Sequence, residues 1–97
     1  MQNVEAIKYT LFGHKAELRE KFKVKNLGVF GSYVRGEQKG TSDVDVLVEF
    51  EDPVGLFEFM KLENYLSDLL GVKVDLVSKR ALKPHIGERI LEEVIMI

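Results

Sequence analysis

The sequence of 97 residues contains no cysteine, so the chain can form neither disulfide bonds nor thiolate metal sites. It also contains no apolar run near the roughly 20 residues that are needed to cross a bilayer. Its first residues lack the basic region and apolar core of a secretion signal. We therefore expect a single domain over residues 1–97, located in the cytoplasm, with no membrane partner.

An excess of one charge sign is also lacking, since 14 basic residues are balanced by 16 acidic ones for a net charge of −2. Domains that bind nucleic acid directly are usually strongly basic, so we expect no such binding here. The hydrophobic fraction of 45% and the charged fraction of 31% are ordinary for a soluble globular protein. A chain of this length can bury one modest hydrophobic core.

The most informative stretch of the chain is residues 31–45, GSYVRGEQKGTSDVD. Gly31 and Ser32 follow one short apolar run, and Asp43 and Asp45 open a second one. That order predicts a strand, a turn that can bind phosphate, a loop, and a second strand that carries two carboxylates.

Alternation along residues 43–50 places these two carboxylates together. Side chains alternate across a strand, so the even-numbered residues, three valines and a phenylalanine, form a core face. Asp43 and Asp45 project from the other face, and two carboxylates that close repel each other unless a cation lies between them. Hard oxygen ligands of this kind suit Mg²⁺.

A third carboxylate, Asp75, lies in another strand-like run, residues 72–77. If this run forms a strand beside residues 43–50, Asp75 can join the pair and complete a site for two metal ions that serve displacement at phosphorus. The simpler alternative is that Asp75 forms an ion pair with Lys73 or Arg80.

The turn at Gly31 supplies groups that suit a phosphate ligand. Glycine allows close approach of the backbone, and the Ser32 hydroxyl can begin a short helix whose free N–H groups attract anions. Arg35 can bind phosphate through its planar guanidinium group. Ser32 could serve only as a helix cap and Arg35 only as a surface residue, while Ser42 either caps the loop or contacts a triphosphate, with the structural role preferred.

Periodicity predicts the remaining elements. We expect helices, in order, over residues 2–22 with a break at Gly13-His14, over 32–36, over 56–70, and from His85 to about Met96 with its apolar side chains inward. We expect strands at residues 27–30, 43–50 and 72–77. The helix at 56–70 has a wide apolar stripe, which is either a generous core or a partner surface. The apolar C-terminal tail must be covered by the domain itself, by a second copy or by a partner.

The spacing of Gly31-Ser32, Asp43-x-Asp45 and the later Asp75 resembles the signature of the nucleotidyltransferase superfamily of DNA polymerase beta. In so short a chain, the string GSYVRGEQKGTSDVDVLVEF is similar to that of its smallest branch, the minimal nucleotidyltransferases. These proteins occur in prokaryotes and are commonly paired with HEPN-domain ribonuclease toxins.

The resemblance extends from about Val24 to the C-terminus. It implies a small α/β (α+β) nucleotidyltransferase fold, with a mixed twisted sheet, helices packed mainly on one side, and the acidic site at the sheet edge. It also implies transfer of AMP from Mg-ATP to a hydroxyl, a tyrosine of a partner HEPN toxin, so that the chain acts as an antitoxin.

In that scheme three residues are catalytic and hold two Mg²⁺ ions, namely Asp43, Asp45 and Asp75. Four residues bind the phosphates of ATP, namely Gly31, Ser32, Arg35 and Ser42. Two alternatives stay open. The chain could be a non-catalytic nucleotide-binding module that neutralises its partner by masking, or the catalytic half of a two-protein nucleotidyltransferase that acts on a small molecule.

Overall fold

The computed structural model describes residues 2–97, which form one four-stranded mixed sheet with the strand order β3-β2-β1-β4. The strands are β1 (Val24–Phe30), β2 (Val44–Phe50), β3 (Val74–Ser78) and β4 (Ile95–Met96). The helices are α1 (Val4–Gly13), α2 (Lys15–Phe22), α3 (Ser32–Arg35), α4 (Leu56–Leu70) and α5 (Pro84–Glu93), with a short 3-10 turn η1 (Lys79–Ala81). β1 is antiparallel to β2 and β4, whereas β2 is parallel to β3. The predicted α/β class with a mixed sheet is confirmed.

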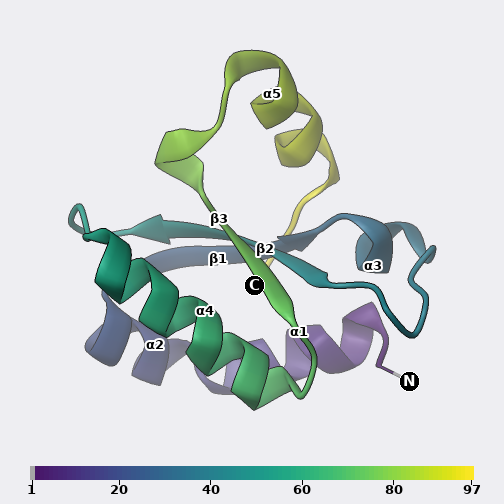
Figure 1. The fold of residues 1–97 in the computed structure, drawn as a ribbon, viewed down its shortest axis with the longest axis horizontal. Helices are drawn as coiled ribbons and strands as arrows, with labels where there is room; N and C mark the ends of the chain where they lie inside the picture. The colour runs from purple at the N-terminus through teal and green to yellow at the C-terminus, as the bar shows by residue number, and fades with distance from the viewer. Residues whose placement is uncertain (1) are drawn as a thin grey trace.

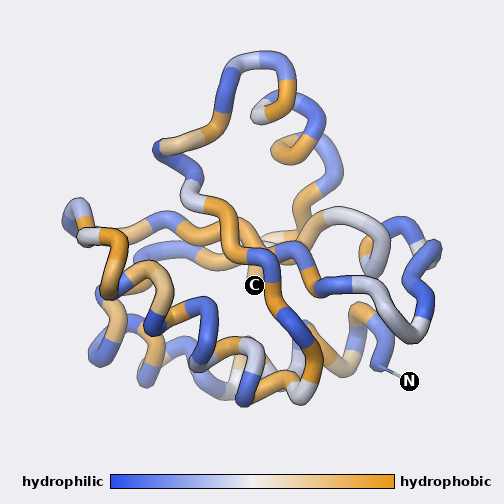
Figure 2. The backbone as a smooth tube through the Cα atoms, viewed as in Figure 1, coloured by the Kyte–Doolittle hydropathy of each residue, from blue (hydrophilic) through white to orange (hydrophobic). Residues whose placement is uncertain are grey.

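Three helices cover one face of the sheet. Helices α1, α2 and α4 lie beneath it in Figure 1, and α5 lies on the opposite side. The predicted core face of β2 is confirmed, because Val44, Val46 and Val48 are all fully buried. They belong to a core that also contains Leu62 and Leu66 of α4. In Figure 2 hydrophobic colour runs through the middle of the sheet and alternates with hydrophilic colour along the helices.

Helix α4 begins and ends where its sequence predicts. It stops at Gly71, whose φ of 69° lies in the left-handed region that glycine adopts without strain. Leu62, Leu66 and Leu70 on one side of the helix are buried, but the first turn is not, because Leu56 and Phe57 are 75% and 73% exposed. The predicted break between α1 and α2 is also confirmed at Gly13-His14. Among residues 2–97, no helix combines the length and hydrophobicity that crossing a membrane requires.

The prediction that the last helix continues to Met96 is wrong. Helix α5 ends at Glu93, and Val94 is extended with ψ of 137°. The following residues form β4, which pairs with β1, and the Ile97 N–H donates to the Leu27 carbonyl oxygen at 2.9 Å. The tail forms a strand because the open edge of β1 offers backbone partners that an exposed helix end lacks. The domain's own sheet therefore pairs with the backbone of the tail, while the Met96 side chain stays 51% exposed.

Two side chains that were expected to point inward from α5 do not. Ile86 is 58% exposed and Leu91 is 49% exposed, whereas Ile90 is partly buried. Ile86 and Ile90 line a cavity on the sheet side of α5 instead of joining the buried core. This arrangement leaves a hollow between α5 and the sheet.

Candidate active site

The parallel pairing of β2 and β3 places two of the predicted carboxylates side by side. Asp45 on β2 is the register partner of Asp75 on β3, as the sequence predicts if the two strands are neighbours. On its other side Asp45 is paired with Phe30, the last residue of β1 before the Gly31 turn. Both carboxylates line a cavity of about 620 Å³ between the sheet and α5.

Gly31 closes this cavity next to Asp45, in a backbone conformation that only glycine tolerates. Its φ is 83° and its ψ is −154°. A Cβ atom at this position would collide with the Asp45 carboxylate and would lie 2.9 Å from its Cγ atom. The absence of a side chain therefore brings the Gly31 backbone directly against Asp45. The predicted short helix follows, and Gly36 ends it with φ of 71°.

Burial raises the pKa of Asp45 to about 6, and repulsion by Asp75 and Asp43 adds to the effect of burial. Arg35 acts in the opposite direction but does not cancel these effects. The site therefore carries more negative charge than its own residues neutralise. Two neighbouring carboxylates of this kind, with hard oxygen donors, fit a divalent cation such as Mg²⁺.

Asp43 is placed less closely than predicted. It precedes β2, which begins at Val44, where the backbone N–H donates to the Lys73 carbonyl oxygen at 2.9 Å and starts the pairing with β3. Asp43 is not among the described residues that line the cavity, and residues 2–97 contain no cluster of three or more acidic or histidine side chains at metal-binding distances. Metal binding by all three aspartates thus stays a prediction.

The two serines do not line the cavity in the described part of the chain. Ser42 accepts a hydrogen bond from the Lys39 backbone N–H at 2.8 Å, so it caps the loop that precedes β2. The alternative role for Asp75 finds no support, because the ion pairs formed within residues 2–97 do not join it to Lys73 or Arg80.

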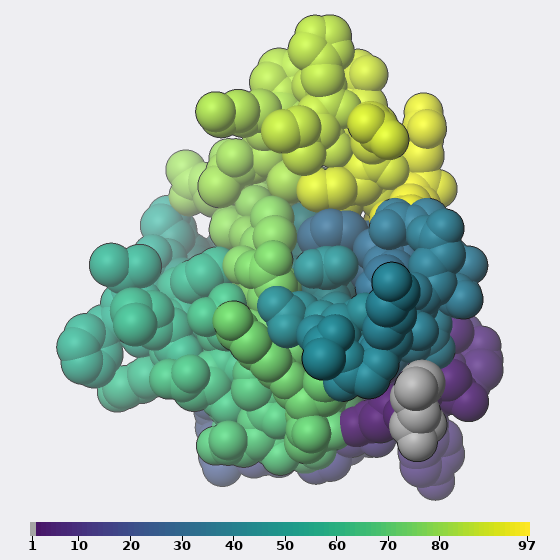
Figure 3. Space-filling view, turned by 45° about the vertical axis from the view of Figure 1, so that its right-hand side comes forward, coloured from purple at the N-terminus to yellow at the C-terminus, as the bar shows by residue number. Residues whose placement is uncertain are grey.

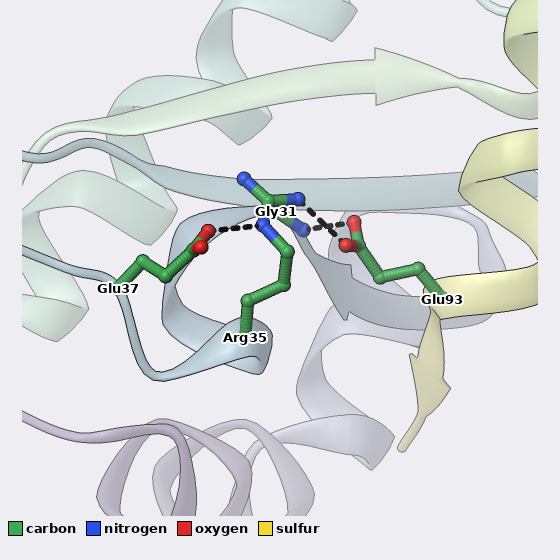
Figure 4. A network of polar contacts seen from close by, with 4 residues as sticks. All are labelled: Gly31, Arg35, Glu37 and Glu93. Atoms are coloured by element: carbon green, nitrogen blue, oxygen red, sulfur yellow. Dashed lines mark hydrogen bonds and ion pairs between the residues drawn. The ribbon is translucent and has the colours of Figure 1, made fainter.

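Arg35 lines the cavity, and two carboxylates bind its guanidinium group (Figure 4), so phosphate binding by Arg35 stays a prediction. Its Nε donates to Glu37 at 2.6 Å, and its Nη1 donates to Glu93 at 2.6 Å. The other Glu93 oxygen accepts the Gly31 backbone N–H at 2.7 Å. These hydrogen bonds, led by that from Glu37, raise the pKa of Arg35.

Glu93 is a site residue that the sequence reasoning missed. Burial favours a higher pKa for Glu93, but its bonds to Arg35 and Gly31 outweigh burial and lower that pKa. One sequence signal was available. Glu92 and Glu93 both lie in the last turn of α5, where the helix dipole disfavours negative charge unless a partner compensates it.

Helix α5 also contributes basic and apolar groups that the sequence reasoning did not assign. Lys83 and Arg89 line the cavity together with Leu82, Ile86 and Ile90. In Figure 3 the light-green to yellow C-terminal segment lies directly above the blue segment that contains α3. The cavity therefore combines an acidic floor, a basic wall and apolar surface. This combination can hold a polyanion together with a cation.

Comparison with known proteins shows the family to which the chain belongs. Residues 13–97 match the family model described as a nucleotidyltransferase domain, so the chain belongs to the nucleotidyltransferase family. Within that family it is 53% identical to protein adenylyltransferase MntA of Thermococcus cleftensis, over 100% of this chain and 98% of the relative. It is also 48% identical to a candidate protein adenylyltransferase of Methanocaldococcus jannaschii, over 100% of both chains.

Solved structures place the chain in the minimal branch of the family, as the motifs predicted. A structure described as a candidate minimal nucleotidyltransferase is 36% identical, with a TM-score of 0.81 over 97% of this chain and 95% of that one. A toxin–antitoxin complex with AMP-PNP contains a chain with a TM-score of 0.73 at 24% identity, over 87% of this chain and 69% of that one. The second likeness shows a shared fold.

Proposed function

We propose that this nucleotidyltransferase transfers AMP from ATP to a hydroxyl group of a partner protein. One observation carries the proposal: Asp45 and Asp75 lie side by side against the Gly31 turn in a single cavity. A triphosphate and an acceptor hydroxyl can meet at this point. The full-length identity of 53% with protein adenylyltransferase MntA supports a protein as the acceptor.

The chemistry asked of the chain is mainly positioning. The acceptor oxygen forms a bond to the α-phosphorus, the bond from that phosphorus to the bridging oxygen breaks, and pyrophosphate leaves. Asp75, which is exposed at the sheet edge, takes the proton of the hydroxyl as general base. Arg35 and the Gly31 N–H hold the β- and γ-phosphates, with Ser32 beside them.

Asp43, Asp45 and Asp75 would hold divalent cations, most simply Mg²⁺, which when bound neutralise phosphate charge and lower the pKa of the acceptor hydroxyl. The raised pKa of Asp45 supports this assignment, because a bound cation would offset both the burial and the repulsion by Asp75 and Asp43 that raise it. Lys83 and Arg89 add positive charge on the opposite wall of the cavity.

The partner that we propose is a HEPN-domain toxin, and the acceptor is one of its tyrosine hydroxyls. A solved complex that shares the fold, with a TM-score of 0.68, contains a tri-AMPylated HEPN toxin of Shewanella oneidensis with its MNT antitoxin. The cavity of this chain is formed at the sheet edge, where the side chain of another protein can enter. The chain then acts as a cytoplasmic antitoxin that silences its partner by modification.

The test is an AMP-transfer assay with a purified HEPN-domain protein from the same organism, Mg²⁺, and ATP labelled on either the α- or the γ-phosphate. We expect the partner to be labelled only by the α-label. The Asp45→Asn variant should label nothing, whereas the matched control Asp68→Asn, an exposed aspartate on α4, should act like the parent chain. Labelling that persists in Asp45→Asn would contradict the assigned site.

A masking module is the second candidate, because α4 exposes a cluster of apolar side chains in its first turns. These are Leu56, Phe57 and Met60. If the chain neutralises its partner by covering it, Asp45→Asn should still protect cells that express the toxin. If AMP transfer is required, that variant should lose protection while its complex with the toxin stays intact.

A further inference from the structure

We propose that Glu93 is an internal competitor for the triphosphate, and that it sets the affinity of the site for ATP. Its carboxylate binds the same Gly31 N–H and Arg35 guanidinium group to which the proposed function assigns the phosphates. The inference rests on that proposed function for the identity of its ligand. Glu93 is a positioning residue in this scheme, because it acts on the substrate through the two groups that it occupies.

The geometry is that of an anion in an anion site (Figure 4). One Glu93 oxygen accepts the Gly31 N–H at 2.7 Å, and the other accepts Arg35 Nη1 at 2.6 Å. Both distances are short, as in charge-assisted hydrogen bonds. The Glu93 side chain is only 23% exposed, so solvent screens these contacts less than it would at the open surface.

The two ligands exclude each other because the donors are limited. Gly31 has a single backbone N–H, and while it donates to Glu93 it is not available to a phosphate oxygen. Arg35 is shared between Glu93 and Glu37, which bind its Nη1 and Nε atoms, so only the remaining N–H groups of its guanidinium are available to a phosphate. A competent site therefore requires that Glu93 leave. The apparent affinity for ATP is then the intrinsic affinity multiplied by the fraction of molecules in which Glu93 has left.

The chain provides a place for the released carboxylate. Arg89 lies four residues before Glu93 on α5, the spacing at which side chains on a helix face each other. Arg89 also lines the cavity, and its charge already acts on Glu93. Displacement thus exchanges one arginine partner for another, and the negative charge at the end of α5 is not left uncompensated.

The experiment compares binding of AMP-PNP with Mg²⁺ to the parent chain and to Glu93→Gln by calorimetry. Glutamine keeps the shape of the side chain but weakens its hold on both donors, so we expect about tenfold tighter binding. Glu92→Gln is the matched control, because it removes the same charge from the exposed neighbouring residue. It should change the affinity less than about twofold.

The direction of the change separates competition from a structural role. If Glu93 only holds Arg35 or α5 in place, Glu93→Gln will bind AMP-PNP more weakly, and the proposal is overturned. Unchanged affinity overturns it as well. In the transfer assay a competitor predicts a lower KM for ATP with kcat retained, whereas a damaged site predicts a lower kcat. Glu93→Ala repeats the test without any hydrogen-bonding group.

Failure of this inference can be told apart from failure of the proposed function. Tighter binding to Glu93→Gln without any AMP transfer would support the competitor and overturn the transfer reaction. AMP transfer with equal affinities would do the reverse. If neither the parent chain nor the Glu93 variants bind AMP-PNP, both proposals are wrong.

Discussion

The two faces of the sheet differ in character, although the same strands supply both: one is a buried apolar face and the other borders an acidic cavity. On the face covered by α1, α2 and α4, β2 presents Val44, Val46 and Val48, all fully buried. On the face toward α5 it presents Asp45 beside a cavity. The two-residue period of a strand allows this separation, because neighbouring residues point in opposite directions. A single strand can therefore stabilise the fold and carry the site.

The contrast extends to what holds each layer in place. The helical layer is attached by hydrophobic burial, which is the dominant favourable contribution to folding. Helix α5 is attached through polar contacts of Glu93, and through β4, which is only two residues long. We therefore expect the α5 layer to open more easily than the helical layer, and to respond separately to mutation. Variants in each layer can test that separation.

The largest effect should come from the helical layer. Leu66→Ala removes a fully buried side chain from α4, and the lost burial together with the cavity should lower the free energy of unfolding by about 3 kcal/mol. Leu56→Ala is the same substitution on the same helix at a site that is 75% exposed, and it should cost less than about 0.5 kcal/mol. Chemical denaturation measures both. Equal losses would contradict the layered description.

On the site face the largest effect should follow Gly31→Ala. The alanine would have to adopt a φ of 83° and would press its Cβ against Asp45, so we expect a loss of roughly 2 kcal/mol together with weaker nucleotide binding. Two glycines serve as controls, because a Cβ added at either would meet no atom within 4 Å: Gly36, which shares the positive φ, and Gly40, which does not. The loss in the free energy of unfolding should be largest for Gly31→Ala, which has both the collision and the positive φ, smaller for Gly36→Ala, which has only the positive φ, and smallest for Gly40→Ala. Equal losses would exclude the collision.

Much of the fold could be predicted because its signals are local. The alternating valines of β2 and the apolar spacing of α4 each report which face is buried, and Gly71 marks the end of a helix by its own conformational freedom. The end of α5 could not be predicted in this way. Its last residues become a strand through pairing with β1, which lies nearly seventy residues earlier and leaves no periodic signal in the tail.

The site residues also fall into those that local sequence patterns predict and those that depend on distant contacts. Asp45, Gly31 and Asp75 could be assigned from spacing and strand alternation, and the structure brings them together. Glu93 could not, because its role depends on a contact between α5 and the Gly31 turn across 62 positions of the chain. Local patterns thus suffice to propose the groups that bind a ligand, whereas the group proposed to compete with the ligand depends on the tertiary fold.

A smaller change in the free energy of unfolding should follow Asp45→Asn in metal-free buffer. The pKa of Asp45 is raised from 3.8 to about 6 in the folded protein, so its charge destabilises the fold above pH 6, and this cost disappears as the pH falls toward 3.8. Asparagine removes the cost, and we expect a gain of roughly 1 kcal/mol at pH 7.5 once solvent screening of a half-exposed carboxylate is allowed for.

Thermal unfolding of both chains across this pH range checks the prediction. The difference in Tm should be largest above pH 6 and should vanish near pH 4. The same variant should lose AMP transfer, which would make Asp45 a residue retained for function at the expense of stability. A variant that is less stable than its parent at pH 7.5 would contradict the predicted repulsion.

The smallest effect should be local to the tail. Gly28 lies under β4, and a Cβ there would lie 2.6 Å from Val94 Cγ2 and 2.8 Å from the Met96 sulfur. In Gly28→Ala the stiff Val94 side chain and the flexible Met96 side chain must move, which weakens docking of the tail. The lower entropy of the unfolded chain with alanine offsets part of the cost in global stability. We therefore expect little change in the denaturation midpoint but faster opening of β4.

Amide hydrogen exchange can resolve this difference between the layers. The Ile97 N–H, which is bonded to Leu27, should exchange about threefold faster in Gly28→Ala, because only local opening is required to expose it. The Val46 amide in the buried strand should exchange at the parental rate, since it opens only with the whole sheet. Adding Val94→Ala to Gly28→Ala removes the colliding methyl group, so hydrogen exchange of the Ile97 amide should slow again. If Val46 and Ile97 accelerate together, the tail and the core open as one unit, and the separation of the two layers does not hold.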